Sequence, residues 1–241
     1  QLRLARKIQQ KLLPESPSEF SGLRLAGISE ASDQVGGDYF DYFSLDVERT
    51  GLSVGDVSGH GVASALIMAN VRATLRSLLL TRGSLGGVYG LMNRALCNDL
   101  SEGRFVSLFV AVFDPRQMTL EFQNAGHPAP ILYTPESGEM IEIESNAPAL
   151  GILDEISAGP CPTIPVRKGD WLITYTDGVT EAHDPDRQLY GDERLKALIR
   201  RTITPESKPD DLMGAVQEEL REWSAGRAQG DDVTLVAARF V

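Results

Sequence analysis

The chain has 241 residues, of which 42% are hydrophobic and 24% are charged, a composition typical of a globular protein that buries a core. Its 23 Lys and Arg residues against 34 Asp and Glu residues give a net charge of −11. This balance argues against a nucleic-acid or anionic-membrane surface and suits a cation or a basic or neutral protein partner. The two cysteines, Cys97 and Cys161, show neither metal-ligand spacing nor a disulfide framework, so we expect a reducing, cytoplasmic environment.

The first predicted element is a helix over residues 1–13. Leu4, Ala5, Ile8 and Leu12 form an apolar stripe along it, and Pro14 ends it. The chain begins inside this helix without an initiator methionine or a signal peptide. We therefore expect residues 1–18 to be a linker or signalling helix that follows a further domain. The alternative is a short helix packed on the core of the domain that residues 19–241 form.

Blocks of strands and helices follow one another along the rest of the chain. Strands are predicted over 23–29, 39–45, 51–57, 105–113, 119–124, 128–133, 139–143, 163–166, 170–176 and 233–240. Helices are predicted over 60–81, 85–100, 194–201 and 209–224. The Pro- and Gly-rich segment 144–168 is expected to be a surface excursion. Grouped rather than alternating elements predict an α+β layered domain with antiparallel sheets and helices outside.

No apolar run is expected to cross a membrane. The strongest candidate, 66–80, is interrupted by Arg72 and Arg76. The apolar residues of this stretch recur at helical spacing and are interpreted as one face of a core helix.

Four aspartates stand in glycine- or hydroxyl-rich contexts at the ends of predicted strands, namely Asp38, Asp56, Asp177 and Asp231. Carboxylates at the ends of buried strands are costly unless a cation lies between them, and few basic residues are near them in sequence. Asp56, the next backbone carbonyl and Asp38 on the neighbouring strand would make an all-oxygen site, which favours Mg²⁺ or Mn²⁺. Each aspartate alone is more often a turn residue, but the four together favour a metal site.

Five motifs resemble, in the same order, those of the SpoIIE/RsbU-like branch of the PPM metal-dependent protein phosphatases. They cover nearly the whole chain and are Gly-Gly-Asp-Tyr-Phe-Asp (36–41), Asp-Val-Ser-Gly-His-Gly-Val-Ala-Ser-Ala-Leu (56–66), Asn-Ala-Gly-His-Pro-Ala-Pro (124–130), Tyr-Thr-Asp-Gly-Val-Thr-Glu-Ala (175–182) and Gly-Asp-Asp-Val-Thr-Leu (230–235). The segment 8–14 also resembles the helix that joins this domain to upstream sensor or receiver domains. The resemblance implies that 19–241 is a PPM-type phosphatase domain, an α-β-β-α sandwich of two antiparallel sheets flanked by helix pairs.

The resemblance also implies a centre of two Mn²⁺ or Mg²⁺ ions. Asp56 would bridge both ions and position the nucleophilic water, and the Val57 carbonyl and Asp38 would bind one of them. Asp177 and Asp231 would hold the other ion. A hydroxide shared by the ions would attack the phosphorus of phosphoserine or phosphothreonine, with no covalent enzyme intermediate.

Several positions near these ligands need separate interpretation. Asp232 follows a ligand and is expected to support the ligands rather than to bind an ion. Asp33 and Gln34 stand where animal members of the superfamily have a phosphate-binding arginine. His60 is a candidate general acid, with a helix-entry role as the equal alternative. His127 replaces an acidic residue found at a third metal position in other branches, which weakens the case for a third ion.

The resemblance implies a bacterial signalling phosphatase that acts on a phosphorylated protein, such as a STAS-type anti-sigma-factor antagonist. An upstream sensor or receiver domain and a homodimer formed through the N-terminal helix are also expected. A change in the orientation of that helix is expected to be transmitted to the metal site through segment 55–61. One alternative is a catalytically silent regulatory module of the same fold, but the intact aspartates argue against it. The other is a hydrolase of small phosphoesters or nucleic acid, and the acidic net charge disfavours nucleic acid as its substrate.

Overall fold

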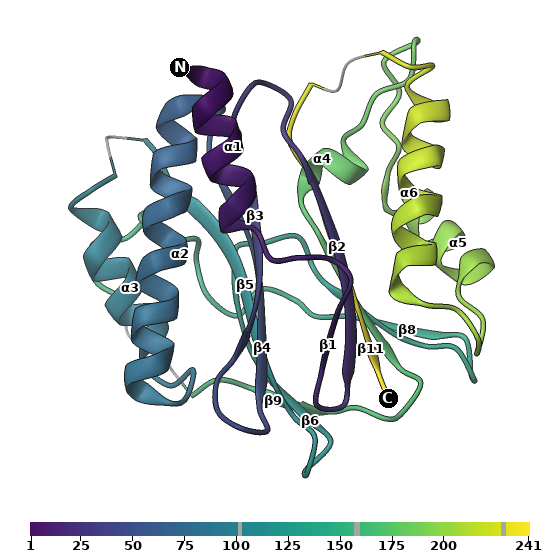
Figure 1. The fold of residues 1–241 in the computed structure, drawn as a ribbon, viewed down its shortest axis with the longest axis horizontal. Helices are drawn as coiled ribbons and strands as arrows, with labels where there is room; N and C mark the ends of the chain where they lie inside the picture. The colour runs from purple at the N-terminus through teal and green to yellow at the C-terminus, as the bar shows by residue number, and fades with distance from the viewer. Residues whose placement is uncertain (101–102, 157–159, 228–229) are drawn as a thin grey trace.

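Two antiparallel sheets lie face to face between two layers of helices in the computed structural model, which describes residues 1–100, 103–156, 160–227 and 230–241 (Figure 1). The first sheet has the order β1-β2-β11-β10-β7-β8. Its strands are β1 (Ser18–Phe20), β2 (Leu23–Glu30), β7 (Ile131–Thr134), β8 (Glu139–Glu142), β10 (Trp171–Tyr175) and β11 (Val233–Phe240). The second sheet has the order β3-β4-β5-β6-β9. Its strands are β3 (Tyr39–Ser44), β4 (Thr50–Val57), β5 (Val106–Asp114), β6 (Thr119–Ala125) and β9 (Thr163–Pro165).

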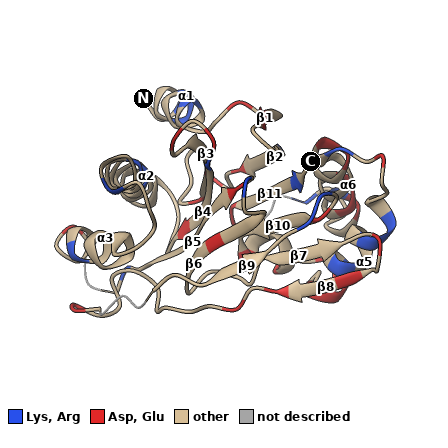
Figure 2. Ribbon diagram, turned by 90° about the horizontal axis from the view of Figure 1, so that it is seen from below, with Lys and Arg blue, Asp and Glu red and all other residues tan. Residues whose placement is uncertain are grey.

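Two pairs of helices cover the two outer faces of the sandwich, among six helices in the described residues. The six helices are α1 (Leu2–Leu12), α2 (Val62–Arg82), α3 (Val88–Cys97), α4 (Asp177–Thr180), α5 (Asp192–Thr202) and α6 (Pro209–Trp223). Helices α2 and α3 cover the second sheet, and α5 and α6 cover the first (Figure 2). This arrangement confirms the predicted α-β-β-α sandwich of two antiparallel sheets flanked by helix pairs.

Both faces of the central strands are buried, and their alternation assigns each residue to a layer. In β5, Leu108 and Val110 pack under α2 and α3, whereas Phe109 and Ala111 pack between the sheets. Successive side chains of a strand point to opposite faces, so an apolar strand between two layers contributes to both. The interior therefore has three hydrophobic layers, two under the helix pairs and one between the sheets.

Some elements differ from the sequence prediction. Strand β1 and the single-turn helix α4 were not predicted, because three- and four-residue elements carry too little periodicity. The segment 144–168 is only partly a surface excursion, since Ala147 and Leu150 form bridges to the second sheet and Leu150 is buried. Residues 157–159 of that segment lie outside the described residues.

Helix α2 is the one helix in the described parts of the chain that is long and apolar enough, by length and composition, to cross a membrane. The sequence prediction excluded such a run. Length and composition alone do not distinguish a membrane span from a core helix that covers a sheet. Here Met68 and Leu75 are buried in the layer under α2 and α3. Arg76 makes two hydrogen bonds of 2.6 Å to the buried carboxylate of Asp41 on β3, and Arg72 lies 3.3 Å from it. The arginines thus fix α2 on its sheet.

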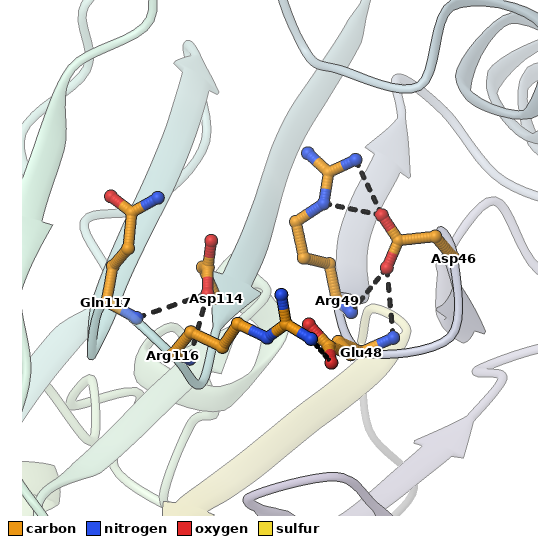
Figure 3. A network of polar contacts seen from close by, with 6 residues as sticks. All are labelled: Asp46, Glu48, Arg49, Asp114, Arg116 and Gln117. Atoms are coloured by element: carbon orange, nitrogen blue, oxygen red, sulfur yellow. Dashed lines mark hydrogen bonds and ion pairs between the residues drawn. The ribbon is translucent and has the colours of Figure 1, made fainter.

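The two hairpins of the second sheet are joined at the end where their turns lie (Figure 3). In the β3–β4 turn, Asp46 accepts backbone hydrogen bonds from Glu48 and Arg49 at 3.0 and 2.8 Å. These bonds hold the pKa of Asp46 at about 2, below its usual value. In the β5–β6 turn, Arg116 forms an ion pair with Glu48. Turn geometry sets hairpin register, so this end helps to determine which residues face each other at the other end of β3 and β4.

Candidate metal centre

Strand register brings Asp38 and Asp56 to the same end of the second sheet. Tyr39 pairs with Gly55, so the next residues outward, Asp38 and Asp56, stand opposite each other. Both share strand parity with the residues that fill the layer between the sheets, such as Phe40 and Val54. The two carboxylates therefore lie where the apolar filling between the sheets ends. The structure brings these two predicted ligands together.

The first sheet supplies three more aspartates to this end of the inter-sheet layer. Asp177 follows β10 and begins α4, and Asp231 and Asp232 precede β11. Strands β10 and β11 are antiparallel neighbours, with Tyr175 paired to Leu235, so the end of one lies beside the start of the other. The four predicted ligand aspartates thus come from two strand pairs, one in each sheet.

Thr234 and Thr176 form a chain of hydrogen bonds to Asp38 across the gap between the sheets. Thr176 donates from Oγ1 to Asp38 Oδ2 at 2.7 Å, and the backbone N–H of Thr234 donates to Thr176 Oγ1 at 3.0 Å. Thr176 and Thr234 are fully buried; Thr234 lies on β11, and Thr176 directly follows β10. Sequence reasoning missed them. The signal was present, because Thr174, Thr176 and Thr234 are hydroxyls at alternate positions of otherwise apolar strands.

Asp232 is buried and organises the segment that leads to Asp38. Its Oδ1 accepts hydrogen bonds from the Ser32 N–H at 2.7 Å and the Ser32 hydroxyl at 3.0 Å. Its Oδ2 accepts a hydrogen bond from the Gly37 N–H at 2.7 Å. A Cβ atom at Gly36 would lie 2.1 Å from Asp232 Oδ2, so only glycine fits there. These contacts hold the segment before Asp38, and the supporting role of Asp232 stays a prediction.

The carboxylates shift one another's pKa values upward. Burial, and then the charges of Asp177, Asp231 and Asp232, raise the pKa of Asp56 to about 7. Burial and the charge of Asp56 raise the pKa of Asp38 well above its usual value. Burial and the charge of Asp231 also raise the pKa of Asp177. The influences that lower the pKa values of Asp38 and Asp56 are hydrogen bonds, so no cationic side chain among the described residues is the main partner of this cluster.

The donor set fits a hard cation. A divalent ion would offset the repulsion between carboxylates that raise one another's pKa values, and all the donor atoms are oxygens. A Cβ atom at Gly37 would lie 2.6 Å from the Val57 carbonyl oxygen, so glycine leaves that oxygen uncovered beside Asp38. Within the described ranges, no three acidic, His or Cys side chains are already grouped as they would be around one ion.

The two histidines of the motifs occupy different environments. His60 is exposed on the loop before α2. His127 is buried, and its Nδ1 lies 2.9 Å from the Ser107 hydroxyl. Ser107 pairs with Asp56 across β4 and β5, which places His127 beneath the candidate centre. Burial lowers the pKa of His127 to about 3, and the Tyr175 backbone offsets only part of this shift. His127 is therefore a neutral interior residue.

The chain is thus an α-β-β-α sandwich with a cluster of aspartates at one end of its inter-sheet layer. The sequence profile of the family described as Stage II sporulation protein E (SpoIIE) matches residues 46–241. The chain belongs to the SpoIIE family, as its motifs predicted.

Individual relatives agree with this assignment. The chain is 26% identical to the phosphoserine phosphatase RsbU of Bacillus subtilis, over 99% of this chain and 70% of RsbU. It is also 26% identical to protein IcfG of Synechocystis, over 98% of this chain but only 41% of IcfG. The chain thus spans less than half of that relative. The SiaA-PP2C domain of Pseudomonas aeruginosa superimposes with a TM-score of 0.84 at 24% identity, covering 100% of this chain and 96% of that domain, which confirms the fold.

Proposed function

We propose that this chain is the catalytic domain of a Mn²⁺- or Mg²⁺-dependent serine/threonine protein phosphatase. The observation that supports it most strongly is the convergence of Asp38, Asp56 and Asp177, whose pKa values are raised by burial and by neighbouring carboxylates. Clustered carboxylates destabilise a folded protein unless a bound ligand offsets their desolvation and mutual repulsion. A silent binding module gains nothing from keeping them, so the enzyme is the favoured function.

In this proposal the two sheets each contribute ligands. Asp38, Asp56 and the Val57 carbonyl would hold an ion at the end of the second sheet. Asp177 and Asp231 would hold the other, with Asp56 between the two. When bound, such ions supply a polarised water and neutralise charge on phosphoryl oxygens.

Other residues of this chain prepare the site. Asp232 and Thr176 fix the backbone and carboxylate of the segment around Asp38 through the hydrogen bonds described above. The inter-sheet layer behind them excludes water, because its apolar side chains are buried. His60, exposed on the loop after β4, is the candidate proton donor to the leaving serine oxygen.

The proposed substrate is a phosphorylated signalling protein. RsbU is a phosphoserine phosphatase by name and matches nearly the whole of this chain, which supports phosphoserine as the reacting group. A STAS-type partner, a cytoplasmic setting and a controlling upstream domain belong to the same proposal.

The test is a comparison of substrates and metals on one preparation of the chain. A phosphoserine peptide, p-nitrophenyl phosphate and a short oligonucleotide are incubated with Mn²⁺, with Mg²⁺ or with chelator. We expect hydrolysis of the phosphopeptide only with metal, and little or no cleavage of the oligonucleotide. Hydrolysis that persists in chelator would contradict the metal-dependent assignment. Metal-dependent hydrolysis restricted to the small ester would contradict a protein substrate.

A further inference from the structure

Arg104 reaches from the segment just before β5 to the loop that follows Asp56. Its Nη1 donates hydrogen bonds to the Ser58 carbonyl at 3.1 Å and to the Ser64 hydroxyl at 3.0 Å. Ser58 lies two residues beyond Asp56, and Ser64 is a buried residue in the first turn of α2. One guanidinium thus joins the end of β4 to the beginning of α2.

The backbone beside Arg104 completes the hold on Ser58. The Ser58 N–H donates to the Phe105 carbonyl at 3.0 Å, and the Phe105 N–H donates to the Ser58 hydroxyl at 3.0 Å. With the bond from Arg104, the N–H, hydroxyl and carbonyl groups of Ser58 are all engaged by residues 104 and 105. The peptide that follows Val57 therefore has little freedom to rotate.

Val57, Ser64 and Gly37 are packed without spare room. A Cβ atom at Gly37 would lie 2.6 Å from the Val57 carbonyl oxygen and 3.1 Å from Ser64 Cβ. Gly59, the residue after Ser58, has a φ of +86°, a conformation that favours glycine. A displacement of Ser58 or Ser64 would therefore move the Val57 carbonyl relative to Asp38.

We propose that Arg104 is a positioning residue that sets how strongly the centre binds the ion assigned to Val57 and Asp38. This inference rests on the proposed metal-dependent function. Arg104 acts through the backbone rather than through its charge, because the leading electrostatic influences on Asp38 and Asp56 come from other carboxylates. Residues that orient metal ligands in this way typically change affinity by about 10–100-fold when they are removed.

The test is Mn²⁺ binding to Arg104→Gln, Ser64→Ala and the wild type, measured by calorimetry and by the Mn²⁺ dependence of the melting temperature. We expect Arg104→Gln to weaken Mn²⁺ binding by about tenfold, and Ser64→Ala to weaken it by a smaller factor in the same direction. Arg94→Gln, an exposed change on α3, is the matched control and should bind Mn²⁺ like the wild type.

The possible outcomes have distinct meanings. Wild-type affinity in Arg104→Gln would overturn the inference, and so would an equal loss of melting temperature with and without saturating Mn²⁺ at unchanged affinity. If Arg104→Gln does not fold, wild-type affinity in Ser64→Ala would overturn it instead. A wild-type chain that binds no Mn²⁺ would refute the proposed function itself, which separates the two failures.

Discussion

The side-chain amide of Gln9 on α1 hydrogen-bonds both backbone groups of Gly36. Its Nε2 donates to the Gly36 carbonyl at 2.7 Å, and its Oε1 accepts from the Gly36 N–H at 3.2 Å. Gly36 lies two residues before Asp38. Helix α1 buries none of its residues fully, so this amide is a specific link between α1 and the candidate centre. Within the described residues, the side-chain hydrogen bonds of α1 to the domain run to Gly36 and not to the expected segment 55–61.

Gln9→Ala should raise the Mn²⁺ concentration needed for half-maximal phosphatase activity. The variant loses two hydrogen bonds that hold the segment before Asp38, each worth about 1 kcal/mol, and 1 kcal/mol corresponds to about a fivefold change in an equilibrium. The measurement is a Mn²⁺ titration of phosphopeptide hydrolysis. Gln10→Ala, at an exposed neighbouring position, is the control. Equal titrations for Gln9→Ala and the wild type would show that α1 does not act through Gly36.

Ile8→Asp should weaken self-association without unfolding the domain. The predicted stripe is divided in the structure: Ala5 and Leu12 are half-buried, whereas Leu4 and Ile8 are 63% and 55% exposed. A charge at an exposed position should change the free energy of unfolding by less than about 1 kcal/mol. Sedimentation over a range of concentrations measures the effect. An unchanged mass distribution would exclude this face of α1 as a dimer interface.

Asp232→Asn should destabilise the protein by about 1–3 kcal/mol whether or not Mn²⁺ is present. Both carboxylate oxygens accept backbone N–H groups, from Ser32 and Gly37, and an asparagine amide offers only one acceptor. Urea denaturation in chelator and in excess Mn²⁺ measures the loss. A loss seen only with Mn²⁺ would instead identify Asp232 as a ligand.

Acidification should destabilise the chain partly through His127. Its pKa is about 3 in the folded state, below its ordinary value of about 6.5, so protons bind the unfolded chain more readily. The stability that the neutral ring contributes is complete above about pH 6.5 and falls by about 1.4 kcal/mol per pH unit between about pH 6 and 3.5. His127→Gln should therefore flatten the pH dependence of unfolding, and His183→Gln, at an exposed site, should not. Parallel curves for wild type and His127→Gln would contradict this.

The layered fold was predictable because long strands and helices carry strong periodicity. The register of β3 with β4 also follows from a hairpin whose turn lies between them, so the meeting of Asp38 and Asp56 could be anticipated. The partners of Asp41 could not. Arg72 and Arg76 interrupt an apolar helix in the sequence, and only the packing of α2 on β3 shows that they face one buried carboxylate.

The supporting residues of the centre were harder to predict than its ligands. Thr234 lies on one strand of the other sheet and Thr176 directly follows another, and the contact of Thr176 with Asp38 depends on how the two sheets pack. The contacts of Arg104 with Ser58 and Ser64 likewise join residues 46 and 40 positions apart in sequence. Sequence patterns report the face of an element, not the partner that the face meets.

Mn²⁺ binding to Asp56→Asn tests most directly whether Asp56 lies between two ions bound by carboxylates of both sheets. In the metal-free state this change should leave the stability of the fold unchanged or raise it, because it removes a buried negative charge that the carboxylates of Asp177 and Asp231 repel. Calorimetric titration should find two Mn²⁺ ions per wild-type chain and weaker or fewer ions in Asp56→Asn, together with loss of phosphopeptide hydrolysis. If Asp56→Asn binds two ions with undiminished affinity and keeps near-wild-type turnover, Asp56 does not lie between two catalytic ions.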